Sequence, residues 1–154
     1  MNFPLFINLN EKKVLIVGAG AIAARRATVL VEFGAQVTVV APEAGSGVRE
    51  LADAGCLVWK QHAFGLQDLE NLDQSFLVIA ATNDPAVNDH IVQLCHERHI
   101  PVNHAGDQSQ CDFQFPAIVR SDPVVIGINA GGKDHGLVKR VAAGLRKWIA
   151  GEKF

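Results

Sequence analysis

The chain of 154 residues carries 14 Lys and Arg against 16 Asp and Glu, which gives a formal net charge of −2 and a pI near 6.3. This balance lacks the basic excess typical of nucleic-acid binders, so we expect no nucleic-acid partner. Hydrophobic residues make up 49% of the chain and charged residues 19%. That composition argues against disorder and fits one ordinary domain, with or without a small appendage.

The cysteines and the N-terminus indicate the compartment. The three cysteines form no C-x-x-C pair, so the sequence predicts no disulfide framework and a reducing, cytoplasmic location. Asn and Pro interrupt the apolar residues at the N-terminus, and no basic region precedes them. We therefore expect neither a signal peptide nor a membrane span.

The first elements form a strand, a helix and a second strand. An apolar run at residues 13–17 ends at Gly18 and predicts a buried strand. The Ala-rich segment 21–33 predicts a helix that Gly34 ends, and residues 36–41 predict the next buried strand. Strand, helix and strand within about thirty residues make one βαβ unit.

The same alternation continues to residue 112. We expect a short helix at residues 48–54, strands at 56–59, 76–81 and 100–103, and a helix that begins at Pro85. The order of these elements predicts an α/β fold with a Rossmann-like, doubly wound parallel sheet.

The pattern changes after Asp112. Residues 113–119 and 124–129 predict an antiparallel hairpin, which Gly131 and Gly132 end. In the terminal helix that follows, we expect an inward apolar face of Leu137, Val141, Leu145 and Trp148, opposite the basic residues Lys139, Arg140, Arg146 and Lys147. We place the domain boundary between residues 1–112 and 113–154. Because an isolated hairpin is marginally stable in water, we expect residues 113–154 to form a homodimer interface.

A dinucleotide-binding motif follows the first predicted strand. Residues 18–23 match G-x-G-x-x-A and open a helix. Gly18 would permit the tight turn, Gly20 would let a pyrophosphate approach the backbone, and Ala23 would let the helix pack on the strand. We therefore expect Gly18, Gly20, Ala21, Ile22 and Ala23 to bind a dinucleotide; the alternative is a glycine turn without a ligand.

Two further strand ends contribute to this prediction. Pro42 and Glu43 follow the second strand, where an acidic residue would bind the adenosine ribose; Glu43 and the absence of Arg at this strand end favour NAD over NADP. The alternative for Glu43 is a solvated loop carboxylate. Thr82 and Asn83 follow the fourth strand, where open α/β sheets bind ligands, although a plain helix cap is the alternative there.

Other chemistries find little support in the sequence. Cys95, His96 and His99 share one predicted helix, but their spacing without a further ligand is poor support for a metal, so we expect surface histidines and no metal site. No P-loop, G-x-S-x-G or H-E-x-x-H motif is present in the chain.

At this point the chain resembles the N-terminal module of siroheme synthase, the precorrin-2 dehydrogenase family. The similarity implies NAD-dependent oxidation of precorrin-2 to sirohydrochlorin, in some members with ferrochelatase activity in the same site, on a Rossmann domain followed by a dimerisation region. The matching segments are residues 3–6, 14–23 with Arg26, 37–43, 79–84, 102–103, 111–113, 115–119 and 131–133.

The resemblance also suggests site residues. Family members carry a catalytic Asp at the position of Gly106, so we expect the neighbouring carboxylate, Asp107, to take that role. We expect Asn103, His104, Lys133 and Arg140 to bind the tetrapyrrole, a polycarboxylate; a solvated basic helix face is the alternative for the cations.

Other departures from the family are Asp134 and His135, where it has Ser-Pro, and the end of the chain at Phe154, where members often continue into a helical region. Together with Gly106, the missing region motivates a second hypothesis. It is a catalytically impaired, NAD-binding dimer that acts as a sensor or partner protein in tetrapyrrole metabolism.

Overall fold

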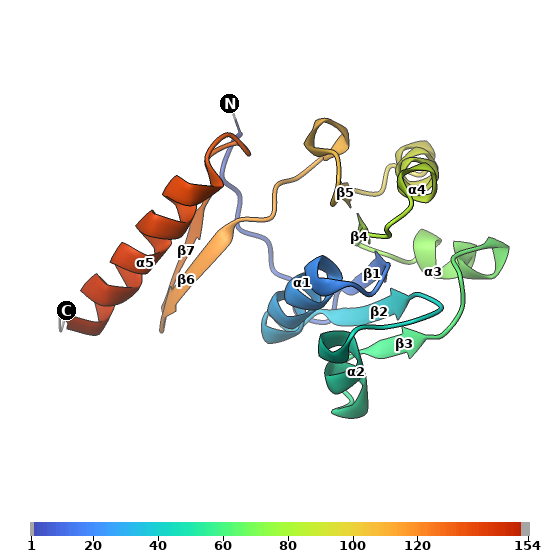
Figure 1. Cartoon of the computed structure of the whole chain (residues 1–154), viewed down its shortest axis with the longest axis horizontal. Coiled ribbons are helices and arrows are strands. Elements are labelled where there is room, and N and C mark those ends of the chain that lie inside the picture. Colours follow the sequence, from blue (N-terminus) through green and yellow to red (C-terminus); the bar gives the residue numbers. More distant parts are fainter. Residues whose placement is uncertain (1, 152–154) are drawn as a thin grey trace. The chain divides into compact units, whose positions relative to one another are not determined.

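The computed structural model describes residues 2–151 and divides the chain into two compact units. Residues 7–113 form the larger unit, and the N-terminal residues up to Phe6 join residues 114–151 in the smaller one (Figure 1). The larger unit has one sheet and several helices, and the described part of the smaller unit has one sheet and one helix.

The larger unit is built on a five-stranded parallel sheet in the order β3-β2-β1-β4-β5. This order confirms the predicted Rossmann-like sheet. Val17 is paired with Val40 on one side and with Ala80 on the other, so the three central strands end at the same level. The strands are β1 Lys13–Val17, β2 Gln36–Val40, β3 Val58–Lys60, β4 Leu77–Ala80 and β5 Val102–His104.

Helices cover both faces of this sheet. Buried alanines of α1 pack against one face, and α4 packs against β4 and β5 on the other, with the core residues Ile91 and Cys95. The short helix α3 contributes the buried Leu72 to that core, with Leu69 packed against it. Its five residues were not predicted because they are too few for a helical period. The helical elements are α1 Ala21–Glu32, α2 Ser46–Asp53, η1 Leu66–Asp68, α3 Leu69–Asp73, α4 Pro85–Glu97 and η2 Gln108–Gln110.

The segment after η2 covers the open edge of β5. The backbone amide of Asp112 donates to Val102 O at 2.9 Å, and a carboxylate oxygen of Asp112 accepts from Val102 N at 2.9 Å. Asn103 Nδ2 donates to Phe113 O at 2.7 Å. Residues 112 and 113 are thus bound to the parallel sheet, and the prediction that the hairpin begins at residue 113 is wrong.

The smaller unit consists of an antiparallel hairpin and a helix. β6 Ala117–Ser121 and β7 Val124–Ile128 pair around Asp122 and Pro123, and α5 His135–Gly151 packs on β6. Arg146 Nη2 donates to Ile118 O at 3.0 Å. The hairpin-plus-helix architecture is confirmed.

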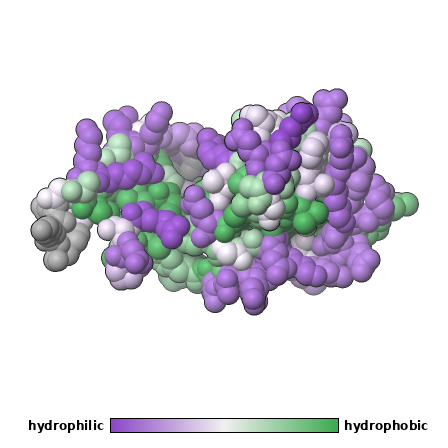
Figure 2. Space-filling model, turned by 90° about the horizontal axis from the view of Figure 1, so that it is seen from below, coloured by the Kyte–Doolittle hydropathy of each residue, from purple (hydrophilic) through white to green (hydrophobic). Residues whose placement is uncertain are grey.

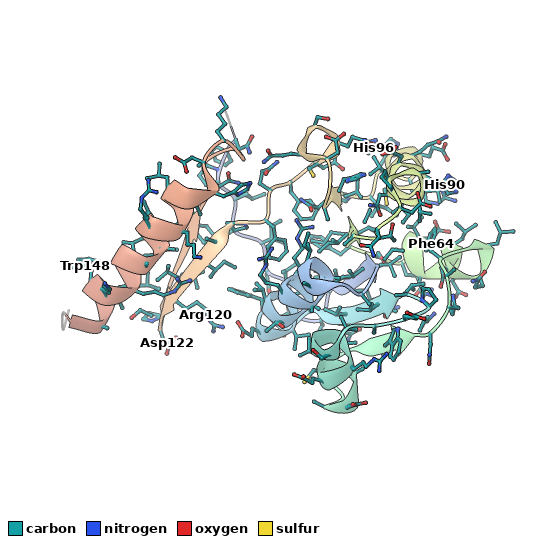
Figure 3. All side chains as sticks on the ribbon, viewed as in Figure 1. Phe64, His90, His96, Arg120, Asp122 and Trp148 are labelled. Atoms are coloured by element: carbon teal, nitrogen blue, oxygen red, sulfur yellow. The ribbon has the colours of Figure 1, made fainter. Side chains whose placement is uncertain are left out.

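The predicted inward face of α5 is wrong in part. Leu137, Val141 and Trp148 are 44%, 40% and 46% exposed, and Trp148 is labelled in Figure 3. The helix instead turns the small, buried Ala142 inward, and the partly buried side chains beside it are Val138, Leu145 and Ile149. Both stripes are apolar at helical spacing, and Ala142 allows the closer approach to the hairpin.

Figure 2 shows some apolar surface on each of the two units. None of the helices within residues 2–151 combines the length and the hydropathy that a bilayer crossing requires.

Candidate functional site

The glycine loop joins β1 to α1 and contacts the end of β4. Gly18 has φ +105°, and a Cβ on it would lie 2.2 Å from Ala81 O. Its amide donates to Val40 O at 2.9 Å. Gly18 therefore allows the ends of β1, β2 and β4 to meet, which an L side chain would prevent.

Gly20 has a different environment. It is the N-cap of α1, with no side-chain cap, and no heavy atom lies within 4 Å of a Cβ built on it. The amide of Ala24 donates to Gly20 O at 2.9 Å, so the amides of residues 21–23 precede the hydrogen-bond ladder of the helix. Ala23 is fully buried. This open, positively polarised helix end fits the pyrophosphate of a dinucleotide.

The loop after β2 is held by two side chains. Trp59 Nε1 donates to Ala41 O at 3.0 Å, and Arg49 Nε donates to Ala44 O at 2.8 Å. The guanidinium carbon of Arg49 lies 5.9 Å from the centroid of the Trp59 ring, within cation–π range. Glu43 lies exposed between the two held carbonyl groups.

Arg49 was missed by the sequence analysis, which considered the residues next to the strand end. The helix α2 brings Arg49 back to that loop. The signal that could have identified it is a basic residue in the first turns of the helix after the second strand. The loop is also fixed to the glycine loop, because Gly45 N donates to Ala19 O at 3.0 Å. Pro42 and Glu43 therefore lie on a loop bound to the glycine loop.

Asn88 of α4 holds the end of β4. Its Oδ1 accepts from Thr82 N at 3.0 Å and from Thr82 Oγ1 at 2.8 Å, and its Nδ2 donates to Thr82 O at 3.1 Å. Asp84 caps α4 by accepting from Ala86 N at 2.9 Å. Thr82 is thus engaged in structural hydrogen bonds, whereas Asn83 is exposed. Asn88 was also missed; the signal was an Asn in helical phase with the buried Ile91 and Cys95.

At the end of β5, Asn103 and His104 are 3% and 5% exposed. Arg26 Nη1 donates to Asn103 Oδ1, and burial lowers the pKa of the Arg26 guanidinium from its ordinary value. His104 Nδ1 accepts from the amides of Gly106 at 3.0 Å and Asp107 at 2.8 Å. The two predicted substrate-binding residues therefore have protein partners.

Asp107 is a half-buried carboxylate, and both of its oxygens accept hydrogen bonds. Its Oδ1 accepts from Ser109 Oγ at 2.7 Å and from Ser109 N at 2.9 Å, and its Oδ2 accepts from Gln110 Nε2 at 3.0 Å. The hydrogen bonds from the side chains of Ser109 and Gln110, and after them the one from the Ser109 amide, lower the pKa of Asp107 to about 2. The carboxylate is therefore ionised at neutral pH, and it is a weak base and an oriented acceptor.

Lys133 and Arg140 belong to the smaller unit, where both are exposed. Lys133 follows Gly131 and Gly132, which have φ +62° and +74°. Their contact with a substrate stays a prediction. Among residues 2–151, no three His, Cys, Asp or Glu side chains form a group that could hold a metal ion.

Comparison with known proteins gives a family and a fold. A family model described as "Putative NAD(P)-binding" matches residues 5–117. The solved structure of "SirC, precorrin-2 dehydrogenase" superposes with a TM-score of 0.80 and 29% identity, over 97% of this chain and 74% of that one.

Longer relatives match as well. A "probable multifunctional siroheme biosynthesis protein HemA" of Ruminiclostridium josui is 41% identical over 94% of this chain and 28% of its own length. A "siroheme synthase" of Photorhabdus laumondii is 43% identical over 84% of this chain and 27% of its own length. The chain thus spans less than a third of these relatives.

Proposed function

The chain belongs to the NAD(P)-binding family that matches residues 5–117, and from this premise we propose that it is an NAD-dependent dehydrogenase that oxidises precorrin-2 to sirohydrochlorin. The observation that carries the proposal is the edge where β1, β2 and β4 end, with the open helix end at Gly20. The likeness to a precorrin-2 dehydrogenase over almost the whole chain supports the substrate.

The proposed roles follow the geometry of this edge. Bound NAD supplies a hydride acceptor. The amides of Ala21, Ile22 and Ala23 bind the pyrophosphate at the positive end of α1, with Gly20 leaving room for it. The exposed Glu43, beside Pro42, binds the adenosine ribose, and Asn83, beside Thr82, lies on the nicotinamide side.

Asp107 serves as an anionic carboxylate in this proposal. Loss of a hydride leaves positive charge on the macrocycle, and loss of a proton then completes the oxidation. A carboxylate with a pKa of about 2 stabilises that charge, and it accepts the departing proton less readily than a carboxylate with a higher pKa. Ser109 and Gln110 hold it in one orientation.

We propose NAD rather than NADP because a carboxylate, Glu43, lies on the loop after β2. Arg49 of α2 is the competing feature, since a guanidinium bound to this loop suits a 2′-phosphate. Initial rates with each cofactor test this. We expect Glu43→Gln to raise the KM for NAD more than Arg49→Gln, which removes a hydrogen bond that holds the loop but no proposed ligand of the ribose. A parent enzyme that prefers NADP, and loses that preference in Arg49→Gln, would reverse the assignment.

Anaerobic incubation with precorrin-2 and NAD tests the reaction. We expect NADH and sirohydrochlorin to appear together in the absorbance spectrum. In a second incubation, added Co²⁺ tests the ferrochelatase activity that the resemblance implies. In Gly20→Val, a branched side chain enters the open space and is expected to abolish NAD binding in a folded protein. Unchanged NAD affinity in that variant would refute the cofactor site.

The second candidate is an NAD-binding protein without turnover, a sensor or partner in tetrapyrrole metabolism. The observations that favour it are Gly106 and the low basicity of Asp107. It predicts NAD binding that Gly20→Val abolishes, with no NADH formed in the presence of precorrin-2.

We also propose that the protein is a homodimer through the smaller unit. The support is the outer stripe of α5, where Leu137, Val141 and Trp148 are exposed at helical spacing. Sedimentation at micromolar concentration is expected to show a dimer that Val141→Glu converts to monomer. A parent protein that sediments as a monomer would exclude this interface.

The free thiols Cys56, Cys95 and Cys111 fit the proposed cytoplasmic location.

A further inference from the structure

The imidazole of His104 is unusual in accepting two backbone hydrogen bonds on one nitrogen. Gly106 N lies 3.0 Å and Asp107 N 2.8 Å from Nδ1. A ring nitrogen that accepts has no proton of its own, so the neutral ring carries its proton on Nε2. The side chain is 4% exposed, which leaves little surface for direct contact with a substrate.

The other ring nitrogen faces helix α4. His104 Nε2 is buried, has no hydrogen-bond partner in the described part of the chain, and lies 3.4 Å from Asp89 Oδ1. Gln110 Nε2 donates to that same oxygen at 2.9 Å and to Asp107 Oδ2 at 3.0 Å. The Gln110 amide therefore connects Asp89 of α4 with the carboxylate of Asp107, and the imidazole lies beside this link.

The turn after β5 is also closed at its base. Cys111 Sγ accepts from His104 N at 3.2 Å and lies 3.3 Å from His104 O. A Cβ on Gly106 would lie 3.3 Å from Cε1 of the imidazole, so the ring occupies the room that a side chain at position 106 would need. The imidazole ring thus packs inside the turn to which it is hydrogen-bonded.

We propose that His104 is a positioning residue, which holds the turn of residues 105–110 in the conformation that presents Asp107. The role of Asp107 in turnover rests on the proposed function; the holding of the turn does not. In this assignment, Nδ1 is the essential atom, because it accepts both hydrogen bonds. The charge of the imidazole ring plays no part in holding the turn.

Two variants separate the acceptor from the ring. In His104→Asn, the side-chain oxygen can accept from the same two amides, as Asn commonly does from residues two and three positions on. In His104→Leu, a side chain of similar reach offers no acceptor. His90→Leu makes the same chemical change on exposed α4 surface and is the matched control.

NMR spectroscopy tests the turn without any turnover. In the parent at pH 8, we expect Nδ1 of His104 to resonate as a nitrogen without a proton and Nε2 as a protonated one. We expect the amide protons of Gly106 and Asp107 to stay protected from exchange with solvent in His104→Asn and His90→Leu and to exchange faster in His104→Leu. A proton on Nδ1, or unchanged protection of the two amides in a folded His104→Leu protein, would overturn the proposal.

Kinetics tests the consequence for the reaction. A misplacement near 1 Å costs on the order of 100-fold in rate, so we expect kcat of His104→Leu to fall by roughly 10- to 100-fold. The KM for NAD should be unchanged, and His104→Asn should restore kcat. Equal kcat in parent and His104→Leu contradicts the positioning role. If the parent does not turn over precorrin-2, the proposed function fails and the NMR result still decides the role of His104.

Discussion

The two glycines of the G-x-G-x-x-A motif are expected to respond differently to the same mutation. Gly18→Ala would place Cβ 2.2 Å from Ala81 O at φ +105°, whereas Gly20→Ala places it in open space. We expect Gly18→Ala to lower the free energy of unfolding by about 2 kcal/mol or more, because strained backbone alone costs ~1–3 kcal/mol. Gly20→Ala should change it by less than about 1 kcal/mol. Urea unfolding measures both, and equal midpoints would contradict the distinction.

The cysteines are expected to differ in reactivity. Burial raises the pKa of the Cys95 thiol to about 12, while Cys56 is exposed. Since the thiolate is the reactive form, iodoacetamide at pH 8 should modify Cys56 in the folded protein and Cys95 only after unfolding. Mass spectrometry of the alkylated peptides reports this. Alkylation of Cys95 at the rate of Cys56 would contradict its burial.

The raised pKa of Cys95 also sets a pH dependence of stability. The unfolded thiol ionises near its ordinary value of 9.0, while the folded thiol stays protonated up to about 12. The unfolded state therefore loses protons first as the pH rises, and the contribution of Cys95 to stability is complete below pH 9 and lost between pH 9 and 12. In Cys95→Ala, this part of the alkaline loss should disappear.

At the scale of elements, continuous apolar runs made the parallel strands predictable, because a strand covered on both faces has no polar positions. The helix α5 was harder. Its sequence offers two apolar stripes, one around Ala142 and one with Leu137, Val141 and Trp148, and only the contact with β6 decides between them. Helical period alone carries no information about which stripe packs.

The junction of β4 and α4 is expected to depend on Asn88 more than on the helix cap. Asn88→Ala would leave the amide and the carbonyl of Thr82 without their hydrogen bonds to this side chain. A buried polar group left unsatisfied costs about 1–3 kcal/mol. Asp84→Ala removes an exposed cap worth ~1 kcal/mol. Thermal unfolding of both variants should give the lower Tm for Asn88→Ala, and the reverse order would contradict this reading of the junction.

For the whole molecule, local motifs predicted the parts of the candidate site that lie next to one another in the sequence. The glycine loop is such a part, since its turn and its helix start are consecutive. Arg49 and the network of Asp89, His104 and Gln110 come together through the packing of helices on the sheet. For Arg49 the sequence offers the signal of a basic residue early in the helix after the second strand, whereas no spacing encodes the contacts of the Asp89, His104 and Gln110 network, which required the structure.

Charge is divided unequally along the chain, and we expect this to affect capture of the proposed substrate. Residues 133–154 hold six basic and two acidic residues, and the remainder holds eight basic and fourteen acidic residues. Precorrin-2 is a polycarboxylate, so the basic segment would attract it over a Debye length of ~8 Å at physiological salt. The alternative is a solvated helix face without a role.

The double variant Lys133→Gln, Arg140→Gln separates these possibilities. We expect its KM for precorrin-2 to rise, and to rise most at low ionic strength, because screening already weakens the attraction at high salt. Lys12→Gln with Lys60→Gln removes the same charge from the larger unit and should raise KM less. If the two double variants raise the KM for precorrin-2 equally, the net charge of the protein attracts the substrate and the position of the charges does not matter. If Lys133→Gln, Arg140→Gln matches the parent in KM and salt dependence, the basic face of α5 is solvated surface.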